Sequence, residues 1–151
     1  MKYDVHTVDV ASLFTAAVRG EAQAENLPQK IRELFDVLYK NVELADTGKR
    51  GLNVIYYPGW DSTKAFPIEV GVRVNNHFPD KGPIFCSSTP SGRAVTTVHV
   101  GPYSLLKQAH GAIHEWCADR DDELAGPSWE VYGHWNKDPN QLSTEIYYLL
   151  K

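Results

Sequence analysis

The chain has 151 residues, of which 42% are hydrophobic and 23% charged, the proportions of one ordinary globular domain. A net charge of −4 argues against nucleic-acid binding, which normally requires a basic surface. No apolar run reaches the roughly 18 residues of a membrane-spanning helix, and no apolar signal core follows Met1. We therefore expect one cytoplasmic domain over residues 1–151, with Cys86 and Cys117 as free thiols.

The first half of the chain predicts a strand, a helix and two further strands. Hydrophobic periodicity places these elements at residues 15–19, 27–42, 51–57 and 68–74. Asn26 is the predicted N-cap of the helix. The helical spacing gives one apolar face, formed by Ile31, Leu34, Phe35, Leu38 and Val42.

Two less regular segments flank this first pass. Residues 1–10 mix polar and β-prone side chains, which predicts either an extended arm or a first strand. Residues 75–92 are rich in Asn, Pro, Gly and Ser, so they predict a connector between the two halves. Phe78, Ile84 and Phe85 indicate that this connector packs against the body of the domain.

The second half repeats the same order of elements, at residues 94–100, 104–118, 128–132 and 144–150. Its helix has an apolar stripe formed by Leu106, Ala109, Ile113, Trp116 and Cys117. Two such passes, about residues 1–75 and 93–151, predict an α+β fold. We expect two pseudo-twofold-related β-α-β-β repeats that form an antiparallel sheet with two main helices and a central ligand groove.

The most informative polar residue is Glu130, in a strand rich in aromatic side chains. Alternation along that strand puts Glu130 and Tyr132 on one face and Trp129 on the other. If the last strand is a neighbour, Tyr147 converges with Glu130 on one pocket. A carboxylate flanked by aromatic rings suits an organic cation. The alternative is that Glu130 pairs with an Arg or Lys of an adjacent strand.

Other aromatic and ionisable residues carry weaker signals. Trp60 follows a strand and is expected at the rim of the groove. For Trp116 and Trp129, a place in the core is favoured over a place in the groove. His110 and His114 are spaced to present two metal ligands on one helix face. No third ligand is suitably spaced, so we predict no metal site and interpret both as exposed histidines.

Three segments of the second half together resemble a known family. Val-His-Val-Gly-Pro-Tyr at 98–103, Gly-Pro-Ser-Trp-Glu-Val-Tyr at 126–132 and Thr-Glu-Ile-Tyr-Tyr-Leu at 144–149 are similar to the GyrI-like small-molecule-binding family. This family includes the effector-binding domains of AraC- and MerR-type multidrug regulators and shares the SOUL haem-binding fold. The resemblance covers residues 93–150, and the DNA-binding domain of the regulators has no counterpart, which implies a stand-alone member.

The resemblance also implies roles for particular residues. The groove glutamate of the family corresponds to Glu130, the tyrosine of its Gly-Pro-Tyr motif to Tyr103, and its C-terminal strand tyrosine to Tyr147. The ligand-binding candidates are therefore Glu130, Tyr147, Tyr103, Tyr132, Trp60, Trp116 and Trp129. The expected ligand is a small aromatic, cationic compound, and no haem or other cofactor is expected.

Three functions follow from these candidates. The first is a stand-alone module that senses or sequesters cationic aromatic compounds. The second is a cofactor-independent hydrolase of cyclopropanoid genotoxins, in which Glu130 is the general base and Tyr103 or Tyr147 stabilises the developing charge. The third is a protein-interaction module of the gyrase-inhibitor kind. A homodimer and a gyrase or regulator partner are left open, and no contact with nucleic acid or membrane is expected.

Overall fold

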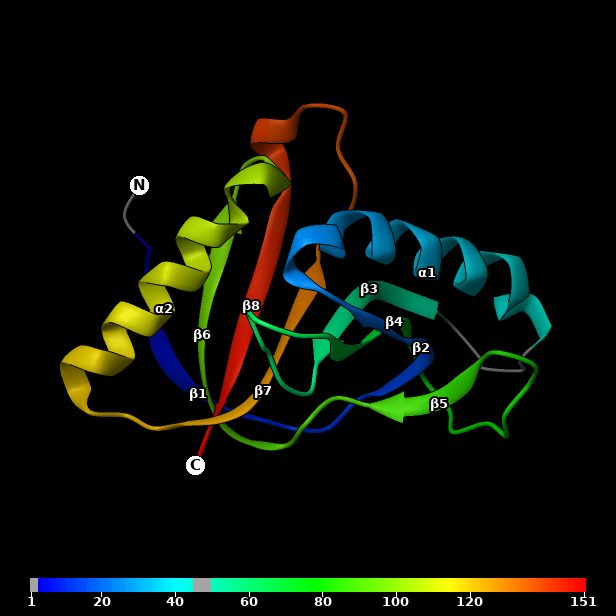
Figure 1. The fold of residues 1–151 in the computed structure, drawn as a ribbon, viewed down its shortest axis with the longest axis horizontal. Coiled ribbons are helices and arrows are strands. Elements are labelled where there is room, and N and C mark those ends of the chain that lie inside the picture. Colours follow the sequence, from blue (N-terminus) through cyan, green and yellow to red (C-terminus); the bar gives the residue numbers. More distant parts are fainter. Residues whose placement is uncertain (1–2, 45–49) are drawn as a thin grey trace.

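The computed structural model describes residues 3–44 and 50–151. It contains one sheet and two long helices, joined by loops and single turns of 3-10 helix (Figure 1). No helix of the described ranges is long and apolar enough to cross a membrane. The strands are β1 (His6–Val10), β2 (Phe14–Ala22), β3 (Arg50–Tyr57), β4 (Phe66–Val74), β5 (Phe85–Ser88), β6 (Gly92–Val100), β7 (Leu124–Tyr132) and β8 (Ser143–Leu150). The helices are α1 (Leu27–Asn41) and α2 (Leu106–Arg120), with 3-10 turns at Ala24–Asn26, Val42–Leu44, Tyr103–Leu105 and Pro139–Gln141.

The eight strands form an antiparallel sheet in the order β1-β6-β8-β7-β3-β4-β2-β5. This order confirms the two predicted β-α-β-β repeats, since β2-α1-β3-β4 and β6-α2-β7-β8 occupy the two halves of the sheet. The halves meet where β3 pairs with β7. Glu130 lies directly opposite Ile55 in that pairing, and therefore at the centre of the sheet.

Each repeat is preceded by one additional strand, and each of these strands joins the opposite half. β1 pairs with β6 of the second repeat, whereas β5 pairs with β2 of the first. The N-terminal segment is thus a first strand. Residues 75–92, predicted as the connector between the halves, contain a strand that the prediction did not include, since Phe85–Ser88 form β5. This short edge strand carries no period-2 pattern that distinguishes it from a loop.

The sheet is strongly curled, because short links join strands that are far apart in its order. β1 and β2 are separated by six inter-strand spacings, about 28 Å in a flat sheet. The link from Val10 to Phe14 can span only about 14 Å. The two edges must therefore approach each other on the face without helices. That inner face buries a small cluster centred on Val54, Ala94 and Trp129.

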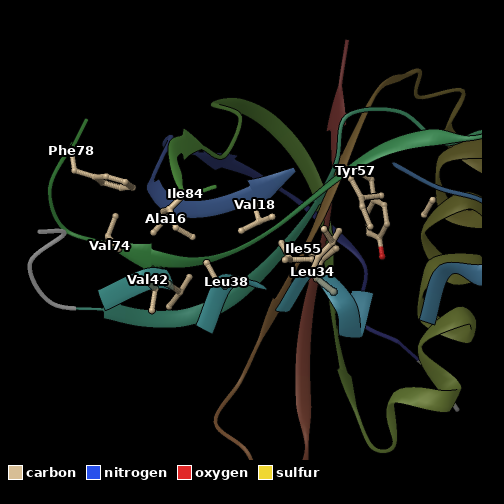
Figure 2. Close-up of a cluster of buried hydrophobic side chains, with 14 of the residues drawn as sticks. Ala16, Val18, Leu34, Leu38, Val42, Ile55, Tyr57, Val74, Phe78 and Ile84 are labelled. Carbon is tan, nitrogen blue, oxygen red and sulfur yellow. The ribbon is translucent and has the colours of Figure 1, made fainter. Parts of the chain in front are cut away.

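The helices pack side by side on the other face, α1 on β2 and β4 and α2 on β6 and β8. In Figure 1, β8 and β7 run between them. As the sequence predicts, α1 buries Leu34 and Leu38, and Val42 follows it into the same cluster (Figure 2). The apolar stripe of α2 buries its own cluster through Leu106, Ala109, Ile113 and Cys117.

The predicted N-cap position of Asn26 is confirmed, although the side-chain hydrogen bond that usually accompanies this position is absent. Asn26 does precede α1, but its side chain makes no hydrogen bond to the first turn of the helix. Its Oδ1 instead accepts a hydrogen bond of 2.8 Å from the backbone N–H of Gln23. A 3-10 turn leads directly into α1, so the asparagine side chain closes that turn in place of the helix.

Candidate functional site

A cavity of about 640 Å³ lies between the start of α1 and the inward face of α2, over the central strands of the sheet. Its size falls within the range of about 300–1,000 Å³ that small-molecule pockets occupy. Most of the side chains that line it are apolar or aromatic. The lining residues are Leu27, Tyr57, Trp60, Leu106, Lys107, His110, His114, Leu124, Gly126, Ser128, Glu130 and Tyr148.

Within the described ranges, Glu130 is the only carboxylate that lines the cavity, and it is buried, with 5% of its surface exposed. Both of its oxygen atoms accept hydrogen bonds. Tyr132 donates its hydroxyl to Oε1 at 2.7 Å, and His110 Nε2 lies 2.6 Å from Oε2. A buried carboxylate needs such partners, because desolvation without them costs several kcal/mol. The alternative that Glu130 pairs with an Arg or Lys of a neighbouring strand is therefore wrong.

His110 connects Glu130 on β7 to the neighbouring strand β8. Its Nδ1 lies 2.6 Å from the hydroxyl oxygen of Tyr148 on β8. When the neutral imidazole donates through Nε2 to the carboxylate, Nδ1 accepts from the Tyr148 hydroxyl. The result is a continuous hydrogen-bond network. It runs from Tyr148 through His110 to one oxygen of Glu130, and Tyr132 contacts the other oxygen.

The two helix histidines differ in their surroundings. The predicted exposure of His110 is wrong, because it faces the sheet from α2 and only 23% of its side chain is exposed. His114, one turn later, is exposed as predicted, and its ring lies edge-on to Tyr148 with the ring centroids 4.9 Å apart. Burial, together with the charge of His110, lowers the pKa of His114. His114 therefore contributes a neutral imidazole to the cavity at neutral pH.

The tyrosines around Glu130 are held in their protonated form. Burial raises the pKa of Tyr57 and of Tyr132 well above the usual value, and the charge of Glu130 raises both further. The same two causes raise the pKa of Tyr148. A phenol that keeps its proton remains a hydrogen-bond donor, so the Tyr132 hydroxyl can donate to the Glu130 carboxylate.

Aromatic rings from the first repeat form the wall opposite α2. Trp60 is 55% exposed and lies at the cavity, where it contacts Tyr57 edge-on at 6.0 Å and Phe66 at 4.5 Å between ring centroids. Figure 2 shows Tyr57 at the end of the core cluster, with its hydroxyl pointing away from the labelled aliphatic side chains. Trp60 therefore occupies the rim of the groove, and its indole face is available to a ligand.

The predicted convergence of Tyr147 with Glu130 is wrong. The register pairs Trp129 with Tyr147 and Glu130 with Ile146, so Tyr147 lies on the inner face of the curled sheet. There its ring stacks on Trp129, with an interplanar angle of 8° and 5.2 Å between centroids. Trp129 is 3% exposed and belongs to the inner cluster. The structure thus places both residues away from the cavity.

Tyr103 and Trp116 are not among the residues that line the cavity. Tyr103 follows the Gly-Pro turn, is 39% exposed, and contacts the ring of Tyr132 edge-on at 5.3 Å. Trp116 is half-buried against the α2 cluster, and the guanidinium of Arg120 lies 4.2 Å from the centre of its ring. Of the seven candidates, Glu130 and Trp60 line the cavity, and Tyr132 contacts Glu130 directly.

Sequence reasoning missed three residues of the site, namely His110, Tyr148 and Tyr57. A signal existed for His110, which lies four residues after Leu106 and three before Ile113, at the edge of the apolar stripe. Tyr148 is adjacent to Tyr147, the predicted residue, and only the register of β7 and β8 shows which of the two shares a face with Glu130. Tyr57 ends a predicted strand and is indistinguishable in sequence from an ordinary core tyrosine.

The chain is similar to known proteins over its whole length. The family described as the GyrI-like small-molecule-binding domain matches residues 4–151. No curated protein matches the chain by sequence.

Among solved structures, the crystal structure of the EcmrR C-terminal domain superimposes with a TM-score of 0.79 at 22% identity, covering 100% of this chain and 99% of that one. The cryo-EM structure of EcmrR with DNA gives a TM-score of 0.83 at 18% identity, covering 99% of this chain and 57% of that one. The chain therefore spans little more than half of the length of EcmrR. The structure of SAV2435 bound to tetraphenylphosphonium gives a TM-score of 0.63 at 16% identity, covering 100% of this chain and 94% of that one. At these identities the likeness establishes the fold, while the family match establishes membership: the chain belongs to the GyrI-like family of small-molecule-binding domains.

Proposed function

We propose that this domain binds an aromatic, positively charged small molecule in the cavity between α1 and α2. The observation that carries the proposal is the buried carboxylate of Glu130 within a cavity of mostly apolar and aromatic lining. An aromatic ligand would stack on Trp60, and its positive charge would be balanced by Glu130.

The electrostatic part of this proposal has a definite size. A cation about 5 Å from the carboxylate gains roughly 3 kcal/mol at an effective dielectric constant of about 20, of which desolvation of the cation offsets a part. The apolar lining supplies affinity to any aromatic compound of suitable size. The carboxylate therefore supplies selectivity for charge, so cationic and neutral compounds of similar shape should differ in affinity.

The test compares tetraphenylphosphonium with the neutral triphenylphosphine oxide, by quenching of tryptophan fluorescence. We expect Glu130→Gln to weaken the binding of the cation by about tenfold or more and to change that of the neutral compound much less. Glu115→Gln is the matched control, because Glu115 is exposed on α2 and is not a lining residue. Equal affinity of wild type and Glu130→Gln for the cation would contradict the proposal.

A further inference from the structure

The charged and basic side chains of the cavity are unevenly distributed. The inward face of α2 presents Lys107, His110 and His114, which are spaced three and four residues apart and so follow one side of the helix. Against these three stands a single carboxylate, that of Glu130. A cavity built only to attract cations would not need a lysine in its lining.

The carboxylate does not neutralise this lysine. Glu130 already accepts hydrogen bonds from His110 and Tyr132 at its two oxygen atoms. Lys107 is exposed, and among residues 3–44 and 50–151 no carboxylate lies within 4.0 Å of its ammonium group. This lining residue thus brings a positive charge to the cavity, with no carboxylate partner from the described part of the chain.

His114 adds a hydrogen-bonding group beside this charge. It lies two turns along α2 from Lys107, lines the same cavity, and is exposed. Its edge-on contact with the Tyr148 ring orients the imidazole. We call Lys107 and His114 together the rim subsite. They lie about one helical turn on either side of His110, which is hydrogen-bonded to Glu130.

We propose that the rim subsite binds an acidic group of the ligand, so that the natural ligand is a zwitterionic aromatic compound. Its positive charge faces Glu130 and its carboxylate faces Lys107 and His114. This inference rests on the proposed function. A simple cation gains from Glu130 but is repelled by Lys107, whereas a zwitterion gains from both. The rim subsite thereby selects among compounds that Glu130 and Trp60 alone would not distinguish.

The test uses two dyes that differ only at the acidic group. Rhodamine 110 carries a free carboxylate beside its cationic ring system, and rhodamine 123 is the methyl ester of the same dye. Fluorescence anisotropy gives the dissociation constant of each dye for wild type, Lys107→Gln and the control Lys137→Gln. Lys137 is exposed and is not a lining residue, so its variant makes the same charge change away from the cavity.

We expect wild type and Lys137→Gln to prefer rhodamine 110 over its ester by about three- to fivefold, the size of an exposed ion pair. Lys107→Gln should abolish this preference by weakening rhodamine 110 and, because Lys107 no longer repels a simple cation, by leaving the ester unchanged or slightly strengthened. Equal binding of the two dyes by wild type, or an equal loss of both in Lys107→Gln, would overturn the rim subsite and leave the proposed function standing. Failure of both dyes to bind would overturn the two together.

Discussion

The structure makes opposite predictions for stability and for binding when His110 is replaced by alanine. His110 Nε2 contacts Glu130 at 2.6 Å, and Nδ1 contacts the Tyr148 hydroxyl at 2.6 Å. Without the imidazole, a buried carboxylate and a half-buried phenol each lose a hydrogen-bond partner. We expect the free energy of unfolding of His110→Ala to fall by about 1–3 kcal/mol, with water from the adjacent cavity replacing part of the lost interaction.

The same substitution should strengthen the binding of a simple cation. In the wild type, a cation that reaches Glu130 must displace the imidazole or share the carboxylate with it. A hydrogen bond to a charged group contributes about 1.5–3 kcal/mol, and about 1.4 kcal/mol corresponds to a tenfold change in affinity. We therefore expect the affinity of His110→Ala for tetraphenylphosphonium to rise between about tenfold and a hundredfold if the cation displaces the histidine fully.

Urea denaturation measures the first effect, and tryptophan-quenching titration with tetraphenylphosphonium measures the second. His134→Ala is the matched control, because His134 is exposed and does not line the main cavity. It should change neither quantity appreciably. If His110→Ala lost affinity in parallel with its loss of stability, His110 would be a ligand contact instead of a competitor. The competition argument would then be refuted.

Two further predictions concern the inner face of the sheet. Burial and the neighbouring carboxylate of Glu145 raise the pKa of Tyr147 to about 12, so its contribution to stability is complete below pH 10 and is lost as the pH rises through 12. The urea midpoint of wild type should therefore fall more steeply than that of Tyr147→Phe between these pH values, and equal slopes would contradict this. Gly71→Ala should lower the free energy of unfolding by about 1–3 kcal/mol, because its Cβ would lie 2.8 Å from the carbonyl oxygen of Ala16. Gly59→Ala, with no atom within 4 Å, should be nearly neutral in the same urea experiment, and equal stability of the two variants would count against the steric argument.

The fold could be predicted from the sequence where a local pattern determines which face is buried. The helical spacing of Leu34, Leu38 and Val42 identified the buried side of α1 correctly. Alternation along β7 placed Glu130 and Tyr132 on one face, and the 2.7 Å hydrogen bond between them confirms it. These predictions depend only on the period of one element, which is a property of the backbone alone.

The site could be predicted only in part, because it depends on how elements meet. Alternation cannot decide whether Tyr147 or Tyr148 shares a face with Glu130, since a shift of one residue in the register exchanges them. The position of His110 at the edge of the apolar stripe indicates partial burial, but only the fold shows that its imidazole lies within hydrogen-bond distance of Glu130. The carboxylate that makes this position of α2 favourable for a histidine is that of Glu130, which lies twenty residues later in the chain, on β7.

The exchanged first strands have a consequence for how the two halves depend on each other. β1 completes the half that contains β6, and β5 completes the half that contains β2. The chain thus has the arrangement of a domain-swapped dimer whose two protomers are covalently joined. A single repeat cut from this protein would leave one edge of its sheet unpaired and would need a second copy to cover it. Because Glu130 and Ile55 face each other where β3 pairs with β7, the cavity above this junction requires both halves.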